Sequence, residues 1–196
     1  MSSPAPARSA RQRALEAALA VLHDDGVAAV TMRAVAEQAG VTATALYRHF
    51  ADKDRLLRDM VREVAALFRD YLASAESRKR PVERLLAALV AARGFALDHP
   101  HYYELLFLTS LGPARRYPDG FRASSGDFAL LVGMVRDCVE AGLFKADDEV
   151  DVALTLASHL HGLVRLWRLG RFGTDRRRFE TFFDESFVRL FAGLAA

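Results

Sequence analysis

The stretch Thr31–Phe50, TMRAVAEQAGVTATALYRHF, decides the fold, because it describes two short helices joined by a tight corner. No helix breaker interrupts Met32–Ala39, and Gly40 follows it with the freedom to adopt the positive φ that often ends a helix. A second helix is expected over Ala43–His49. A helix, a glycine corner and a second helix are typical of a helix-turn-helix, whose second helix lies in the major groove of DNA.

Residue types along this stretch separate an inward face from an outward one. Thr31 and Thr42 are of the types that cap helix N-termini, so each is expected to start one of the two helices. The residues expected in the small core are Val35, Ala36, Ala39, Val41, Leu46 and Phe50. Thr44, Tyr47 and Arg48 are then left facing outward.

The outward residues indicate how the second helix would read DNA. Bases are read by residues early in a recognition helix, whereas phosphates take basic, hydroxyl and backbone N–H donors. Ala43 and Thr44 are small enough to meet a thymine methyl group or to accept a hydrogen bond, and Arg48 is a long donor for a guanine edge. Two alternatives stay open: Tyr47 serves mainly in packing, or Arg48 pairs with an acid on the following helix.

The order of residue types also resembles the TetR family of transcriptional regulators over about the first third of the chain. The positions that carry this resemblance are Thr31, Arg33, Val35-Ala36, Ala39-Gly40-Val41-Thr42, Leu46-Tyr47, His49-Phe50 and Lys53. The resemblance implies that Tyr47 and His49 contact phosphate and that Lys53 is a phosphate-binding lysine, while Thr31 and Arg33 open a helix whose positive N-terminus suits an anion. The expected DNA-binding residues are therefore Thr31, Arg33, Thr42, Ala43, Thr44, Tyr47, Arg48, His49 and Lys53.

Apolar residues recur at three- and four-residue steps along the chain, without the alternation of a strand. The fold class is therefore predicted to be all-α, with about nine helices. The expected helices are Arg8–Asp25, Met32–Ala39, Ala43–His49, Lys53–Ser77, a helix from Pro81 to the break at His99-Pro100, His101–Ser110, Phe121–Ala141, Asp147–Leu169 and Asp175–Leu194.

The charged run Arg78-Lys79-Arg80-Pro81 marks a boundary between two domains. Residues 8–68 are expected to form the DNA-binding domain, with residues 31–50 as its helix-turn-helix. By the same resemblance, residues 78–196 are expected to form a larger helical domain for ligand binding and dimerisation.

Composition excludes several classes of protein. The 196 residues include a single cysteine, Cys138, which excludes an intrachain disulfide and a multi-cysteine metal site. No apolar run approaches the ~20 residues of a membrane span, and the N-terminus lacks the apolar segment of a secretory signal, so a cytoplasmic protein is expected. The net charge of +2 is small, but Arg8, Arg11 and Arg13 precede any acidic residue and form a basic arm suited to a polyanion.

The second domain carries aromatic and histidine residues without a recognisable catalytic motif. Aromatic side chains with a few polar tips are typical of a small-molecule pocket, although an aromatic stripe at helical spacing is more often core. The candidate pocket residues are Tyr102, Tyr103, Phe107, Phe128, Met134, His161 and Trp167. His159 and His161 lie two apart on a helix and face different sides, unlike the ligands of a zinc helix, so no metal site is expected. Without a paired acid motif, a nucleophile elbow or a glycine-rich phosphate loop, neither an enzyme nor a cofactor is expected.

One segment of this domain, Ser158-His159-Leu160-His161-Gly162-Leu163-Val164-Arg165-Leu166, is similar to a group of TetR C-terminal domains that bear a Trp-x-x-x-His-Gly signature. Ala157 stands where that signature has tryptophan, so the signature is incomplete. Gly162 would let another helix approach closely. His161 is either a pocket donor or a core histidine with a backbone partner.

The resemblance as a whole implies a ligand-responsive repressor that binds a palindromic operator as a homodimer, with an unknown small molecule as effector. The last two helices are expected to form the dimer contact, with which Gly162 and the apolar stripe Phe183, Phe187, Leu190 and Leu194 are compatible. A ligand between the fifth and eighth helices would move the long fourth helix and change the separation of the two recognition helices. Two alternatives remain. One is an all-α small-molecule carrier or enzyme with a structural helix-turn-helix, and the other is a non-specific DNA-packaging protein, against which the small net charge argues.

Overall fold

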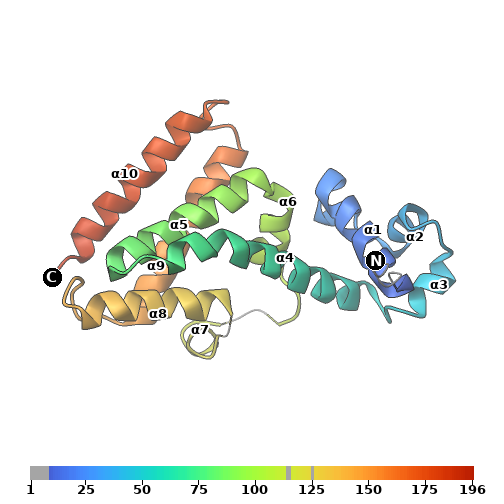
Figure 1. The fold of residues 1–196 in the computed structure, drawn as a ribbon, viewed down its shortest axis with the longest axis horizontal. Coiled ribbons are helices and arrows are strands. Elements are labelled where there is room, and N and C mark those ends of the chain that lie inside the picture. Colours follow the sequence, from blue (N-terminus) through green and yellow to red (C-terminus); the bar gives the residue numbers. More distant parts are fainter. Residues whose placement is uncertain (1–8, 114–115, 125) are drawn as a thin grey trace, which may run out of the picture. The chain divides into compact units, whose positions relative to one another are not determined.

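The computed structural model of the protein describes residues 9–113, 116–124 and 126–196, and Figure 1 shows that this part of the chain is built of helices. It contains ten α-helices, a short 3-10 helix and a π-helical turn, so the predicted all-α class is confirmed for the described residues. The β-type pairing in these ranges is an isolated bridge between Phe144 and Ala195. None of the described helices is long and apolar enough to cross a membrane.

The chain divides into two compact units. The first comprises residues up to Phe68 together with Asp98–Pro113, and the second comprises Arg69–Leu97 and the residues from Ala114 to Ala196. The expected domains, 8–68 and 78–196, differ from this division over residues 98–113, which join the N-terminal unit in the structure. Sequence periodicity alone does not report which neighbour such a short segment will pack against.

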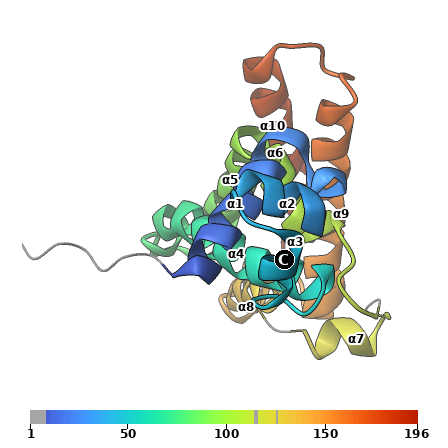
Figure 2. The same ribbon diagram turned by 90° about the vertical axis from the view of Figure 1, so that its right-hand side faces the viewer.

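The N-terminal unit is a small helical core with α6 packed against it. Its elements are α1 (Ala10–Asp25), η1 (Val27–Ala29), α2 (Met32–Gln38), α3 (Ala43–Tyr47), the first part of α4 (Lys53–Glu76), α6 (Pro100–Tyr103) and η2 (Glu104–Leu108). Figure 2 shows α1, α2 and α3 gathered together, and Leu22, Leu46 and Phe50 are completely buried among them. The first turn of α6 lies against α1, where the ring of Tyr102 meets that of His23 edge-on at 5.9 Å.

Helices α1, α2 and α3 of this unit each start at a capping side chain, as predicted for Thr31 and Thr42. Each threonine hydroxyl accepts a hydrogen bond from the backbone N–H three residues ahead, at 3.1 and 3.2 Å respectively. Ser9 caps α1 in a reciprocal capping box with Gln12, so this helix starts later than expected, and Arg8 lies outside the described residues. These caps satisfy N–H groups that have no partner inside a helix.

The prediction that Val41 points into the core is wrong, because 43% of the residue is exposed. Gly40 has a φ of +66°, and the backbone N–H of Val41 donates to the carbonyl of Ala36 at 3.0 Å. This hydrogen bond closes the end of α2 at the surface and leaves the Val41 side chain in solvent. Leu46 and Phe50 are buried as predicted.

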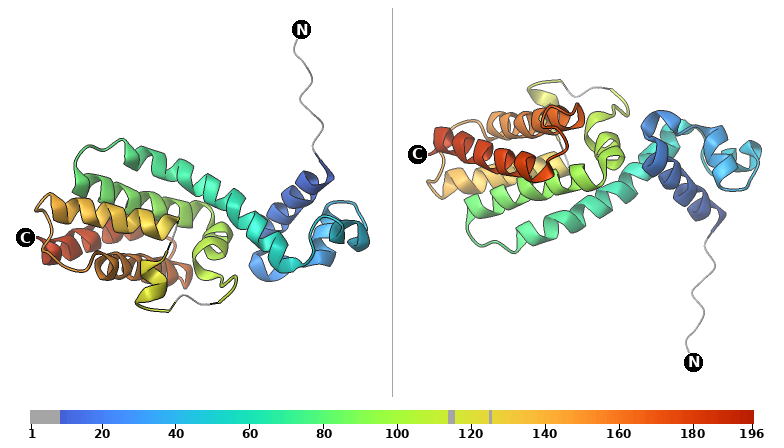
Figure 3. Two further views of the ribbon diagram at one scale, coloured as in Figure 1. Left: turned by 90° about the horizontal axis from the view of Figure 1, so that it is seen from below. Right: turned by 90° about the horizontal axis from the view of Figure 1, so that it is seen from above.

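The second unit is a larger helical body. Its elements are the rest of α4, most of α5 (Pro81–Asp98), α7 (Asp119–Arg122), α8 (Asp127–Glu140), α9 (Glu149–Arg168) and α10 (Arg176–Leu194). Figure 3 shows α5 and α8 side by side, where Arg84 forms an ion pair with Asp137. α9 and α10 are antiparallel neighbours (Figure 2), since Trp167 near the end of α9 stacks on Phe179 near the start of α10 at 5.0 Å.

Two of the predicted helices need correction. The single helix expected over Phe121–Ala141 is instead two, α7 and α8, because Gly126 adopts φ +77° and ψ −141°, outside any helical conformation. The helix expected over His101–Ser110 is α6 followed by the π-helical turn η2. That segment is not buried on all sides as expected, because Leu108 is 45% exposed.

The apolar stripe expected to form a dimer contact on α10 belongs in part to the core of its own unit. Phe183 and Phe187 are completely buried, and the guanidinium of Arg93 from α5 lies over the Phe183 ring at 5.1 Å. Leu190 and Leu194 are half-buried. Phe183 and Phe187 are therefore core residues of their own unit rather than surface residues for a partner, and the dimer contact expected of the last two helices stays a prediction.

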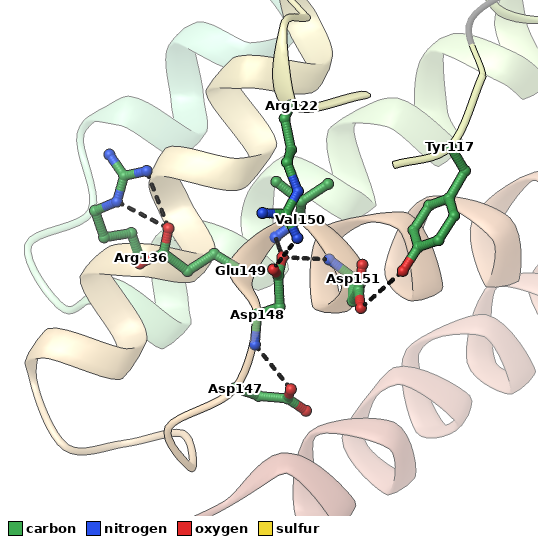
Figure 4. A network of polar contacts seen from close by, with 8 residues as sticks. All are labelled: Tyr117, Arg122, Arg136, Asp147, Asp148, Glu149, Val150 and Asp151. Atoms are coloured by element: carbon green, nitrogen blue, oxygen red, sulfur yellow. Dashed lines mark hydrogen bonds and ion pairs between the residues drawn. The ribbon is translucent and has the colours of Figure 1, made fainter. Parts of the chain in front are cut away.

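A polar network holds the start of α9 to α7 and α8 (Figure 4). Asp148 caps α9 by accepting hydrogen bonds from two backbone N–H groups of the first turn, at 2.9 and 3.3 Å. The same carboxylate pairs with Arg122 of α7 at 2.5 Å, and Arg136 of α8 makes two contacts with Glu149 at 3.0 and 3.1 Å. These contacts fix the first turn of α9 from two neighbouring helices.

Candidate nucleic-acid interface

α3, the second helix of the helix-turn-helix, buries one face and presents the opposite one to solvent. Leu46 and Phe50 are completely buried, which anchors α3 and the residues after it by their inner face. The predicted DNA-facing residues along this helix and its flanks are all exposed: Thr42, Ala43, Thr44, Tyr47, Arg48 and His49. A short helix held in this way has the form of an element that enters a groove of a duplex.

Two of these residues also have a structural interpretation, as packing for Tyr47 and as an ion pair for Arg48. Tyr47 is 53% exposed, so packing occupies only part of its surface. None of the ion pairs among the described residues involves Arg48, so the alternative in which it pairs with an acid on α4 is absent from this part of the chain. Arg48 is exposed, and a role in contacting DNA stays a prediction.

The remaining predicted residues lie at the starts of α2 and α4. Thr31 and Arg33 are exposed at the first turn of α2, and Lys53 is half-buried at the start of α4. The Thr31 hydroxyl accepts a backbone hydrogen bond as the N-cap, which leaves its O–H free to donate. All three residues thus carry a donor of the kind that phosphate accepts.

A buried acid with basic neighbours was not predicted. Asp59 of α4 is 2% exposed and forms ion pairs with Arg11 of α1 and with Arg55 and Arg62 of α4. The sequence does contain one signal, because residues 55, 59 and 62 are four and three steps apart and share a helix face. The contribution of Arg11 comes from another helix, and no spacing in the sequence reports it.

Three of the predicted pocket residues lie in the first unit: Tyr102, Tyr103 and Phe107. Tyr103 is completely buried, and its ring packs against Phe107 at 5.0 Å. The ring of Tyr102 stacks on His99 at 5.5 Å. Burial, and secondarily the charge of Asp24, raises the pKa of Tyr102 above its usual value. These contacts are packing within the N-terminal unit, and a role in a pocket stays a prediction.

The other four predicted pocket residues lie in the second unit: Phe128, Met134, His161 and Trp167. Phe128 meets Phe121 edge-on at 5.4 Å, and Trp167 stacks on Phe179, so both aromatic rings have partners within the unit. Met134 is buried. Burial lowers the pKa of His161, which therefore favours its neutral form. Both interpretations of His161, as a pocket donor or as a core histidine, stay open.

No group of three or more His, Cys, Asp or Glu residues in the described ranges is placed to hold a metal ion. The other histidine of α9, His159, has its Nε2 atom 2.9 Å from Ser186 Oγ on α10. Ser186 in turn donates to the carbonyl of Phe183 at 2.7 Å. This chain of contacts ties α9 to α10 and contains no carboxylate that would orient the imidazole for catalysis.

Two family models match the chain. The model described as "Bacterial regulatory proteins, tetR family" matches residues 14–60, which contain most of the N-terminal unit and its helix-turn-helix. The model described as "Tetracyclin repressor-like, C-terminal domain" matches residues 85–190, which is more than half of the chain.

Individual proteins resemble the chain over most of its length. The transcriptional repressor KstR2 of Mycobacterium tuberculosis is 28% identical over 148 residues, which is 74% of each chain. A structure of a protein with unknown function from Rhodococcus sp. RHA1 is 26% identical, covers 100% of both chains and superposes with a TM-score of 0.77. AibR, in complex with isovaleryl coenzyme A and operator DNA, is 18% identical with a TM-score of 0.67, over 93% of this chain and 97% of its own. At that identity the likeness to AibR concerns the fold alone.

Proposed function

This chain belongs to the TetR family of bacterial regulatory proteins, and we propose that it is a ligand-responsive repressor that binds a palindromic operator as a homodimer. Membership of the family makes it a DNA-binding transcriptional regulator. The observation that carries the proposal is the exposed face of α3, held from behind by the buried Leu46 and Phe50. A protein that regulates bacterial genes in this way works in the cytoplasm, and we propose no enzymatic activity for it.

The proposed division of labour on DNA follows from which donors are exposed. Thr44 and Arg48 are assigned to base edges, because they lie on the outward face of the helix that enters the groove. Tyr47, His49 and Lys53 are assigned to phosphate, together with Thr31 and Arg33 of α2. A recognition helix of little more than one turn contacts few bases. The α3 of a second subunit, about 34 Å away and thus one helical turn along the duplex, would double the number of base pairs that the protein recognises.

The proposed dimer contact lies on the outward faces of α9 and α10. Gly162 of α9 has open space where a side chain would extend, and Leu166 and Leu169, one and two turns further on, are 43% and 52% exposed. On α10, Phe182 and Val188 are 41% and 58% exposed. Exposed apolar side chains beside a glycine position, which lets a second helix approach closely, are typical of a surface that another helix covers.

The dimer is tested by sedimentation of the whole protein at micromolar concentration. Val188→Glu would place a charge in the contact and is expected to shift the protein from dimer to monomer. Leu130→Glu is a matched control, because Leu130 is also apolar and 39% exposed but lies on α8. A wild-type protein that sediments as a monomer, or a Val188→Glu variant that stays dimeric, would contradict this contact.

We assign the effector to the second unit, whose aromatic core and half-buried His161 would supply an apolar environment with a polar group. AibR, of the same fold, is known in complex with an acyl-coenzyme A, which makes small carboxylic acid derivatives a reasonable first set of compounds to screen. A ligand regulates DNA binding only through different affinities for two states of the protein, typically by about 1–3 kcal/mol. A screen in which no compound changes the affinity for DNA would argue against ligand control.

The decisive experiment for DNA binding is selection from random duplexes, followed by titration of the winning site. Lys53→Ala is expected to weaken binding to every duplex and to make its salt dependence shallower, because phosphate contacts carry no sequence information. Thr44→Ala is expected to weaken binding at one base position only. Equal affinity for all duplexes would favour a packaging protein, and no binding at all would favour a carrier or enzyme.

A further inference from the structure

The buried carboxylate of Asp59 is surrounded by three arginines in the N-terminal unit. Its Oδ2 atom pairs with Arg11, and its Oδ1 atom lies 2.6 Å from Nη1 of Arg62 and 3.7 Å from Nε of Arg55. The acid is 2% exposed, whereas the side chains of the three arginines are 43%, 62% and 53% exposed in the same order. We call these four residues the Asp59 cluster.

The Asp59 cluster has more positive charge and more hydrogen-bond donors than its one acid can satisfy. Three guanidinium groups around one carboxylate leave a net charge of about two positive units, and each guanidinium carries five N–H donors. The Oδ1 atom of Asp59 accepts no hydrogen bond of normal geometry, although two arginines surround it. Arg55 and Arg62 are thus attracted by charge while their N–H groups remain available to a further acceptor.

The position of the cluster places it next to the predicted phosphate contacts. The guanidinium of Arg11 lies over the ring of Phe50, 5.2 Å from its centroid. Phe50 comes three residues after Tyr47 and three before Lys53, both of which are assigned to phosphate. Arg55 and Arg62 are seven residues apart on α4 and therefore share one helix face, and Arg55 lies in the first turn of α4, directly after the helix-turn-helix.

From this arrangement we propose that Arg55 and Arg62 bind phosphates of the DNA that flanks the bases under α3. Asp59 is a positioning residue, which holds the two arginines and joins them to Arg11 and thereby to α1. The phosphate-binding surface then extends from the helix-turn-helix along the outer face of α4. Guanidinium groups suit this role because their planar fork matches a phosphate and they are always charged. The proposal rests on the DNA binding proposed above.

The test is the salt dependence of DNA affinity for Arg55→Ala and Arg62→Ala in the full-length protein. Each phosphate contact contributes about 0.9 to the slope of log affinity against log salt, so one lost arginine in each subunit of a dimer makes the slope shallower by about 1.8. The ratio of wild-type to variant affinity should therefore shrink about tenfold between roughly 50 and 200 mM salt. The same change is expected on the selected site and on random duplexes, because phosphates are common to both.

Two further variants separate phosphate binding from a structural role or from bulk charge. Arg62→Lys keeps the charge and is expected to retain most of the salt slope. Arg171→Ala removes the same charge from the exposed turn between α9 and α10, in the second unit, and is expected to leave the slope unchanged. Asp59→Asn makes the cluster more positive but releases the arginines, so it is expected to weaken binding; tighter binding would overturn the positioning role.

The outcomes distinguish this proposal from the proposed function. If the wild-type protein binds no duplex, both the proposed function and the proposed phosphate contacts are refuted. A wild type that binds its site with a steep salt dependence, together with Arg55→Ala and Arg62→Ala variants of unchanged slope, overturns the extended surface and leaves the regulator intact. Variants that lose thermal stability and affinity but keep the wild-type slope would show that the cluster only joins α1 to α4. Because both arginines are largely exposed, these variants are expected to fold even if Asp59→Asn does not.

Discussion

Replacing Gly26 with alanine is expected to destabilise the N-terminal unit by about 2–4 kcal/mol, the sum of a backbone effect and a steric one. Gly26 ends α1 with φ +82° and ψ 178°, a region that only glycine occupies freely. An alanine there costs about 1–3 kcal/mol, less about 0.4–1 kcal/mol gained because alanine restricts the unfolded chain. The added Cβ would also lie 2.9 Å from Nδ1 and 3.1 Å from Cε1 of His101.

The steric part can be isolated, because it requires His101. The ring belongs to the first turn of α6, and its Nδ1 atom is buried, so it has little room to move away from a new methyl group. In a His101→Ala background, Gly26→Ala should cost only the backbone part, about 1–2 kcal/mol. The double-mutant cycle should therefore give a coupling of about 1–2 kcal/mol between the two positions.

The measurements are thermal denaturation followed by circular dichroism, and hydrogen exchange of the amides in α1 and α6. Displacement of His101 should speed exchange in both helices, because the contact between them opens. Strictly additive effects of the two substitutions would refute the steric reasoning, since they would mean that the ring moves aside at no cost. A Gly26→Ala protein as stable as the wild type would refute the backbone reasoning as well.

Three other predictions concern single side chains. Leu46→Ala is expected to lower the free energy of unfolding by about 2–5 kcal/mol, measured by thermal or urea denaturation, because Leu46 is completely buried on the inner face of α3. A loss below about 1 kcal/mol would mean that other residues anchor α3. Asp148→Ala should cost about 1 kcal/mol, because two backbone N–H groups of α9 lose their cap, and Asp148→Asn should recover most of it. Burial lowers the pKa of His161 in the folded protein below its usual value of about 6.5. Near that pH the unfolded chain therefore binds more protons at this histidine than the folded protein does. The stability that neutral His161 provides is present above about pH 6.5 and is lost as the pH falls below it. The urea midpoint of the wild type should fall between about pH 7.5 and 5.5 by more than that of His161→Gln, and equal falls would contradict this.

The helical fold and the helix-turn-helix could be predicted because their determinants are local. Thr31 and Thr42 cap their helices through residues three positions away, and Gly40 ends α2 through its own backbone. The burial of Leu46 and Phe50 follows from helical spacing alone. Interactions of this range are contained in a window of sequence, so periodicity and residue type were sufficient.

The features that could not be predicted depend on neighbours distant in sequence. Asp59 sits in an alternation of charged residues that is typical of a solvated helix face, yet it is 2% exposed and paired with Arg11 of another helix. The spacing of Phe183 is compatible with a subunit contact, but Arg93 of α5 and the neighbouring ring of Phe187 pack against it within the chain. Spacing shows that a residue lies on an apolar face. It does not show whether that face meets the same chain or another one.

The length of α3 has a consequence for how DNA affinity depends on the rest of the protein. Its five residues, Ala43–Tyr47, make little more than one turn, and a helix so short does not persist in water by its own hydrogen bonds. Its conformation must therefore come from tertiary packing, in which Leu46 is completely buried, α3 contacts α2, and Phe50 is covered by Arg11 of α1. Any change that loosens this core lowers the fraction of molecules whose α3 is ready to bind, and apparent affinity falls by that fraction. The exposed residues would thus determine which sequence is bound, and the buried ones how much of the protein is competent to bind it.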